Sequence, residues 1–168
     1  DDVIFGCSWQ VGTQSGDLGR MAALNAGYPI TASGVTLDRF CGSGITAVNL
    51  AAANVMSGLE DVVVAGGAEM MSSYRQNAPK NRNPFMDNGN LHLRALHPQT
   101  NQGVAADAIA TLEGISREDL DALAAESQRR AEVAIAEGRF ERSLVAVLND
   151  DGTVALDREE FPRPGTTA

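Results

Sequence analysis

Lysine and aromatic residues are scarce in this sequence, and cysteine occurs only twice. The 168 residues contain a single lysine, Lys80, and the formal net charge is −9. This balance argues against a general nucleic-acid surface, which needs clustered positive charge. Two cysteines are too few for a disulfide framework and fit a reducing compartment, so we expect a cytoplasmic protein. Together with two histidines they show no metal-ligand spacing, so we expect no metal site.

Long apolar runs are also absent, and no stretch approaches the length of a membrane span. Aromatic residues make up 5% of the chain although apolar residues make up 43%, so we expect elements to pack closely through alanine and glycine. No secretory signal is visible. The chain begins with "DDVIFG", which is typical of the start of a strand, and ends with the turn-like "RPGTTA". We therefore expect it to be part of a longer subunit.

The first 71 residues alternate between strand and helix patterns. Runs rich in β-branched residues predict strands, and apolar residues at three- and four-residue steps predict helices. Ile45, Val48, Ala52 and Val55 form such a helical stripe. The continuous valines after Asp61 predict a strand buried on both faces. The predicted order is strand 3–9, helix 16–27, strand 35–40, helix 42–56 and strand 61–71. This alternation predicts an α/β fold with a layered sheet that has parallel strands.

The second half of the sequence is less regular. Residues 74–103 are rich in Asn, Arg, Pro, Gln and His, and a loop of this length tends to be functional or mobile. A surface excursion and a role in assembly or substrate covering stay equally open. Helices are predicted at 104–113 and from Ser116 to Gly138, and 143–156 is typical of two strands joined by a glycine turn.

Cys41 lies in "TLDRFCGSGITAVNLAA", between a strand pattern and a helix pattern. The N-terminus of a helix stabilises a thiolate, which is the reactive form of cysteine. Gly42 and Gly44 remove side chains near the sulfur and allow unusual backbone conformations. The sequence thus predicts an exposed nucleophile whose own backbone N–H faces an oxyanion. A buried structural cysteine is the alternative, and it is the preferred interpretation of Cys7.

Two motifs resemble the thiolases, the acyl-CoA acetyltransferases. One is Cys41-Gly42-Ser43-Gly44 at the start of a helix, and the other is the strand Gly66-Gly67-Ala68-Glu69-Met70-Met71-Ser72. The resemblance continues through "GISREDLDALAAESQRRA" and "EGRF" to "FPRPGTT", so it covers essentially the whole chain. It implies a thiolase-like layered α/β fold, in which a mixed, mostly parallel sheet is flanked by helices, with a loop-domain excursion. The implied nucleophile is Cys41, held in the turn with Gly42, Ser43 and Gly44.

Thiolases work by ping-pong acyl transfer, with acyl-CoA and CoA as substrates and no further cofactor. The resemblance implies that residues 1–73 are part of the N-terminal thiolase domain, without its first strand and helix. Residues 74–115 would be the loop excursion, and 116–168 the remainder of the domain and the start of a linker. It also implies a homodimer formed through residues 35–40. Many thiolases form tetramers through the loop excursion, but this loop diverges.

Several parts of the family pattern are missing. The family's Gly-His-Pro histidine and second catalytic cysteine have no counterpart, because His97-Pro98 lacks the preceding glycine and Cys7 does not match. We therefore expect these 168 residues to be inactive alone. The family's first strand lies in the middle of its sheet, so its absence should leave neighbouring strands unpaired.

The family's His-Met-Gly stretch that contacts CoA corresponds to Asn101-Gln102-Gly103. Contact through the amide side chains of Asn101 and Gln102 is the expectation here, and the change suggests an acyl group bulkier than acetoacetyl. Two alternatives stay open: a decarboxylating condensing enzyme of the same superfamily, and a non-catalytic lipid-carrier or assembly protein. A papain-like protease is disfavoured, because no histidine or asparagine has that family's context.

Overall fold

The computed structural model describes residues 1–72 and 86–168. The chain falls into two compact units, residues 1–84 and 85–168, and each is described by itself. The part of the predicted polar loop at 74–85 lies outside the described residues.

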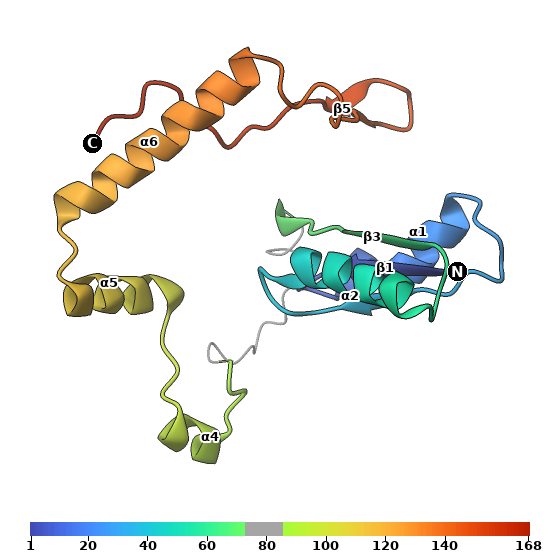
Figure 1. The fold of residues 1–168 in the computed structure, drawn as a ribbon, viewed down its shortest axis with the longest axis horizontal. Coiled ribbons are helices and arrows are strands. Elements are labelled where there is room, and N and C mark those ends of the chain that lie inside the picture. Colours follow the sequence, from blue (N-terminus) through green and yellow to red (C-terminus); the bar gives the residue numbers. More distant parts are fainter. Residues whose placement is uncertain (73–85) are drawn as a thin grey trace. The chain divides into compact units, whose positions relative to one another are not determined.

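The first unit is built on a three-stranded parallel sheet (Figure 1). Its strands, in spatial order, are β2 (Val35–Leu37), β1 (Asp2–Gly6) and β3 (Val63–Gly67). The parallel α/β arrangement predicted from the sequence is present, although each strand is shorter than predicted. β1 pairs with β3 along its whole length, from Asp2 opposite Val63 to Gly6 opposite Gly67. The unpaired neighbours expected from a missing middle strand are therefore not found between β1 and β3.

Two helices cover opposite faces of this sheet, α1 (Leu18–Asn25) and α2 (Ser43–Ser57). Successive side chains of a strand point to opposite faces. Ile4 of β1 packs with Ala47 and Ala51 of α2. The next residue, Phe5, lies against α1, where a Cβ built on Gly19 would be 3.2 Å from Phe5 Cβ. Right-handed connections from β1 to β2 and back across to β3 require this placement.

The ends of these helices follow local rules. The Asp17 carboxylate accepts a hydrogen bond from the Arg20 backbone N–H at 3.3 Å and so caps α1. Gly42 occupies the N-cap position of α2. The helix ends at Gly58, whose φ of 73° is a left-handed conformation that glycine adopts without strain. The helix, Ser43–Ser57, thus agrees with the predicted range 42–56 to within one residue at each end.

The predicted helical stripe of α2 does not face the sheet. Ile45 is 68% exposed and Val55 is 44% exposed. The buried side of the helix is instead made of small side chains: Ser43, Thr46, Ala47 and Ala51. Small residues let the helix axis approach the sheet closely, and a hydrophobicity count cannot distinguish such a face from the larger apolar stripe. α2 therefore has a second apolar side, which is exposed among the described residues.

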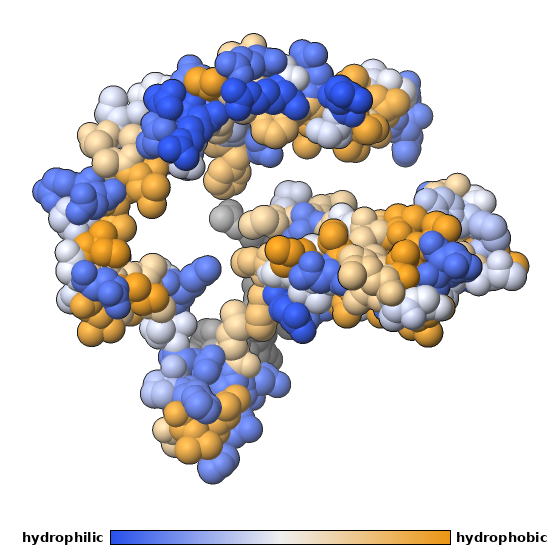
Figure 2. Space-filling model, in the orientation of Figure 1, coloured by the Kyte–Doolittle hydropathy of each residue, from blue (hydrophilic) through white to orange (hydrophobic). Residues whose placement is uncertain are grey.

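The prediction that β3 is buried on both faces is wrong. Val62, just before the strand, is 65% exposed, and Val64 is 37% exposed. Val64 is paired with Val3 and so lies on the α1 face, but α1 packs on β1 and β2. Hydrophobic side chains consequently reach the surface of the first unit, as they also do in the second (Figure 2).

The second unit contains helices α4 (Leu91–Leu96), α5 (Gln102–Glu113) and α6 (Arg117–Ala136), and an antiparallel pair of strands, β4 (Val147–Leu148) and β5 (Val154–Leu156). The helices predicted in the second half and the glycine-turn hairpin are confirmed. Ser116 caps α6 by accepting a hydrogen bond from the Asp119 backbone N–H at 3.1 Å, and the helix begins where the sequence predicted. Two guanidinium groups, those of Arg129 and Arg130, lower the pKa of Glu126 on the surface of this helix to about 2.

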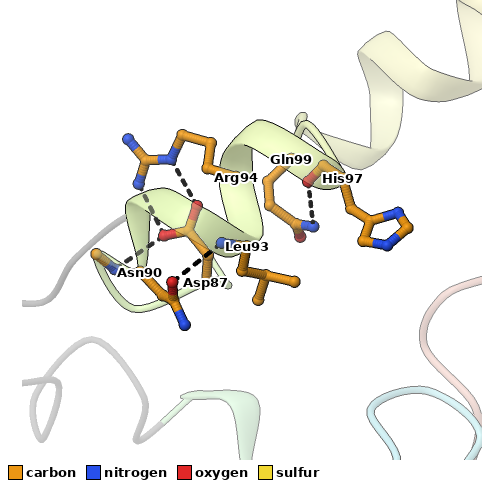
Figure 3. A network of polar contacts seen from close by, with 7 residues as sticks. Asp87, Asn90, Leu93, Arg94, His97 and Gln99 are labelled. Atoms are coloured by element: carbon orange, nitrogen blue, oxygen red, sulfur yellow. Dashed lines mark hydrogen bonds and ion pairs between the residues drawn. The ribbon is translucent and has the colours of Figure 1, made fainter.

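Helix α4 and a short 3-10 helix, η1 (Gly12–Gln14), were not predicted. Figure 3 shows how the polar residues around α4 hold it: Asn90 caps the helix, and the Asp87 carboxylate receives two bonds from Arg94, at 2.6 and 2.7 Å. The Asp87 side chain is fully covered, and the Arg94 guanidinium holds the pKa of this carboxyl below its ordinary value. One such pair fixes a six-residue helix that has no buried residue and no periodic apolar signal.

None of the helices in residues 1–72 and 86–168 combines the length and the apolar composition that crossing a bilayer requires.

The beginning of α2 touches the end of β1 through backbone atoms. A Cβ built on Gly6 would lie 2.7 Å from the Ser43 carbonyl carbon and 2.9 Å from the Gly44 nitrogen. A Cβ built on Gly67 would lie 2.4 Å from the Gly6 carbonyl oxygen. These contacts are with backbone, which cannot rotate away. Glycine at position 6 therefore sets how closely α2 begins beside β1, and glycine at position 67 allows β3 to end close beside β1.

We predict that Gly6→Ala lowers the free energy of unfolding by about 1–3 kcal/mol, because the added methyl group has no room. The matched control is Gly44→Ala, whose Cβ would meet nothing within 4 Å. Because alanine favours helix, this change should leave stability unchanged or raise it by up to about 1 kcal/mol. Urea unfolding followed by circular dichroism measures both. Equal stability of the two variants would contradict the close contact.

Candidate active site

Cys41 lies in the connection between β2 and α2. It directly precedes the N-cap residue Gly42, and its side chain is exposed, as predicted. The connection starts at the carboxyl end of a parallel strand. β1 is followed by a helix on one face of the sheet and β2 by a helix on the other. Ligands of open α/β sheets bind outside the carboxyl ends of the strands, at the point where neighbouring strands are followed by helices on opposite faces. The fold thus puts the thiol at the edge where binding sites form.

The start of α2 also offers an electrostatic environment for an anion. The first N–H groups of a helix have no partner within the helix, and the aligned peptide dipoles give this end a partial positive charge. An exposed thiol beside it is suited to nucleophilic attack on a carbonyl carbon. The role of Cys41 as a nucleophile stays a prediction.

The turn before Cys41 contains an unusual backbone conformation at Phe40, whose φ is 50°. The left-handed region costs a non-glycine residue about 1–3 kcal/mol and tends to occur at functional sites. The Phe40 N–H donates to Asp38 Oδ1 at 2.7 Å. The Phe40 carbonyl accepts from Ser43 Oγ at 2.6 Å and from the Ser43 N–H at 3.0 Å. Both polar groups of this backbone unit are therefore engaged.

The conformational role predicted for the two glycines is wrong. Gly42 has a φ of −89°, and Gly44 is not among the residues with positive φ. The left-handed residue is instead Phe40, whose N–H and carbonyl are bonded to Asp38 and Ser43. A Cβ on Gly42 would lie 3.3 Å from the Arg39 carbonyl oxygen, and one on Gly44 would meet nothing within 4 Å. The role of these glycines in leaving room near the sulfur stays a prediction.

The loops after β1 and β3 are tied together at the same edge of the sheet. Glu69 accepts hydrogen bonds from the Ser8 backbone N–H at 2.7 Å and from Gln14 Nε2 at 3.4 Å. The buried Gln14 side chain also donates to the Trp9 carbonyl at 3.0 Å and accepts from the Met70 N–H. Sequence reasoning missed this network. Glu69 lies within the motif at residues 66–72, but no residue near Gln14 in the sequence indicated that Gln14 is buried.

Cys7 has the environment of a structural cysteine. It is 1% exposed, and its N–H donates to the Leu37 carbonyl at 3.0 Å, which extends the pairing of β1 with β2. Burial, followed by the nearby charge of Glu69, raises the pKa of the Cys7 thiol. Cys7 was predicted to be buried, and this is confirmed.

The other predicted contact residues, Asn101 and Gln102, belong to the second unit. Asn101 is the N-cap of α5, and its side chain accepts from the Gly103 N–H at 3.0 Å. Gln102 is the first residue of that helix and is exposed. His97 lies at the C-terminal end of α4, where its carbonyl accepts a bond from Gln99 at 3.1 Å (Figure 3). Among the described residues, no group of three His, Cys, Asp or Glu side chains could hold a metal ion.

Comparison with known proteins identifies the family. Residues 1–168 match the family described as "Thiolase, N-terminal domain". The chain belongs to the thiolase family. A 3-ketoacyl-CoA thiolase from Saccharophagus degradans is 36% identical over 170 residues, covering 99% of this chain and 42% of that protein. A 3-ketoacyl-CoA thiolase from Shewanella oneidensis is also 36% identical, covering 99% of this chain and 43% of its own length.

The fold is likewise that of the thiolases. The crystal structure of the Bacillus anthracis acetyl-CoA acetyltransferase superposes with a TM-score of 0.77 at 30% identity, covering 99% of this chain and 44% of that one. The predicted thiolase-like fold is confirmed. The chain spans less than half the length of each thiolase it is compared with.

We predict that iodoacetamide modifies Cys41 and spares Cys7 in the folded protein. Cys41 is exposed, whereas Cys7 is buried and its raised pKa keeps the thiol protonated at neutral pH. Peptide mass spectrometry after a time course at pH 7.5 measures both sites, and unfolding in urea should make Cys7 reactive. Equal labelling of the two cysteines before unfolding would contradict the exposure of Cys41 and the burial of Cys7.

Proposed function

We propose that this thiolase chain carries the nucleophile of an acyl-CoA C-acyltransferase. The observation that supports this most is the position of Cys41: exposed, at the start of α2, and at the carboxyl edge of a parallel sheet. The relatives named 3-ketoacyl-CoA thiolase and the neighbour named acetyl-CoA acetyltransferase supply the substrate class, CoA thioesters. No further cofactor is part of the proposal.

The proposed reaction is a ping-pong transfer through a thioester on Cys41. In the cleavage direction the Cys41 thiolate attacks the keto carbon of a 3-ketoacyl-CoA. The carbon–carbon bond breaks, its electrons and a proton form acetyl-CoA, and the acyl group stays on Sγ. The thiol of a second CoA then attacks this thioester and restores free Cys41. In the synthetic direction an acetyl-Cys41 condenses with a second acetyl-CoA. The enzyme thioester preserves the reactivity of the CoA thioester.

The chain provides only part of the machinery that these steps need. The backbone N–H of Cys41 is proposed to bind one developing oxyanion. The Gly-His-Pro histidine and second cysteine implied by the family resemblance have no match in residues 1–168. We therefore propose that these residues form the acyl-accepting half, and that turnover needs the remaining acid–base groups.

We also propose a homodimer that forms through β2. This strand lies at an edge of the three-stranded sheet, and an edge strand offers backbone N–H and C=O groups to another strand. Asn101 and Gln102 stay proposed contacts for the CoA portion. A cytoplasmic location is supported by two cysteines that are both free thiols.

We predict that Cys41→Ala lowers thiolysis of 3-ketoacyl-CoA by at least about a thousandfold in the complete polypeptide that carries this chain, because the covalent step is lost. The matched control Cys7→Ala should retain nearly full turnover. The assay follows loss of the ketoacyl thioester in the presence of CoA, and mass spectrometry locates the acyl group on the Cys41 peptide. An acyl-enzyme that still forms in Cys41→Ala would overturn the proposal.

Residues 1–168 alone should show no thiolytic turnover, although Cys41 should still react with iodoacetamide. Multiple turnovers by this chain alone would contradict the assignment of the remaining groups elsewhere. Condensation that requires a malonyl thioester would instead favour a decarboxylating condensing enzyme.

A further inference from the structure

The conformation of Phe40 needs a cause outside its own side chain. A bulky residue with positive φ is rare, and Phe40 has a φ of 50°. Its side chain is 57% exposed, so packing of the ring does not impose this conformation. The residue stands directly before Cys41, so the cause of its conformation also determines how Cys41 is presented.

Two side chains hold the Phe40 backbone from opposite sides. Asp38 Oδ1 accepts from its N–H at 2.7 Å, and Ser43 Oγ donates to its carbonyl at 2.6 Å. Ser43 is 5% exposed, and its hydroxyl also accepts from the Arg39 N–H at 2.9 Å. A buried hydroxyl that both donates and accepts within one turn has a single useful orientation.

Fixing the Phe40 carbonyl also fixes the N–H of Cys41. The two groups belong to one planar trans peptide, in which they point in opposite directions. The carbonyl is directed towards Ser43 at the start of α2. The Cys41 N–H is therefore directed away from Ser43. This N–H is the proposed oxyanion donor, so its direction decides where an acyl oxygen binds relative to Sγ.

We propose that Asp38 and Ser43 are positioning residues, which lock Phe40 in the left-handed conformation and thereby aim the Cys41 N–H and thiol at the acyl carbonyl. This inference rests on the proposed function, in which Cys41 is the nucleophile. Acyl transfer needs the N–H and the sulfur in one geometry. Alkylation by a small reagent needs only an accessible sulfur. The two reactions therefore separate positioning from exposure.

The test uses the complete polypeptide with the substitutions Ser43→Ala, Asp38→Ala and Asp38→Asn. Asp38→Asn keeps an oxygen acceptor for the Phe40 N–H and should rescue the alanine variant. The matched control is Ser57→Ala at the other end of α2, where Ser57 Oγ donates to the carbonyl three residues earlier, that of Asn54, at 3.0 Å. Ser43 makes the same type of bond to Phe40. Asp38 is exposed, so its variants decide the matter if Ser43→Ala does not fold.

Three quantities are measured for each variant: the rate constant of Cys41 acylation by 3-ketoacyl-CoA, the burst amplitude, and the rate constant of alkylation by iodoacetamide. We expect Ser43→Ala and Asp38→Ala to acylate about 10- to 100-fold more slowly, with the burst amplitude preserved. Alkylation should stay within about threefold of the unsubstituted protein, because it needs no oxyanion donor. Asp38→Asn and Ser57→Ala should acylate at the original rate.

A merely structural role would lower the burst amplitude, which counts competent sites, and leave the rate constant of those sites unchanged. Three results would each overturn the positioning role. They are a lower burst amplitude with an unchanged rate constant, unchanged acylation in both alanine variants, and an equal fall in acylation and alkylation. Failure of the proposed function is distinguishable, because the acyl group would then not be found on Cys41 of the unsubstituted protein.

Discussion

The close contact between the end of β1 and the first turn of α2 is the constraint on which the site depends. It exists because Gly6 has no side chain where its backbone meets the backbone of Ser43 and Gly44. Any larger residue at Gly6 would push the first turn of α2, and with it Ser43, away from the strand end. The thiol of Cys41 is one residue outside that helix, so its position follows from a contact in which it takes no part.

Helix α2 has two sides with different side chains. Its buried side is made of alanine and short polar residues, which allow the close approach to the sheet. Its other side has large apolar residues such as Ile45 and Val48 that are exposed among the described residues. Burial of apolar area is the main favourable term in folding, so the first unit leaves part of this term unused. The small core around Ile4 and Ala47 is consistent with a chain that spans less than half of its thiolase relatives.

The turn from Asp38 to Ser43 has several hydrogen bonds around Phe40, the residue with the unfavourable left-handed conformation. A left-handed Phe40 would not persist by itself, since nothing in its side chain favours that region. Hydrogen bonds to its N–H and carbonyl offset the cost, and the buried hydroxyl of Ser43 takes part in both the turn and the helix start. Rigidity at this point has a chemical consequence, because a nucleophile and its oxyanion donor must keep one mutual geometry.

The order of elements apart from η1 and α4, the parallel sheet, the exposed Cys41 at the start of a helix and the buried Cys7 could all be predicted from the sequence. These features depend on local patterns: β-branched runs, helical spacing and two motifs that resemble thiolases. The face of α2 that packs on the sheet, the exposure of Val64, the left-handed Phe40 and the burial of Gln14 were decided only by the tertiary structure. Each of them depends on which backbone or side chain from another part of the chain lies beside the residue in the folded structure. A pattern of residue types along the sequence does not show which segments lie side by side.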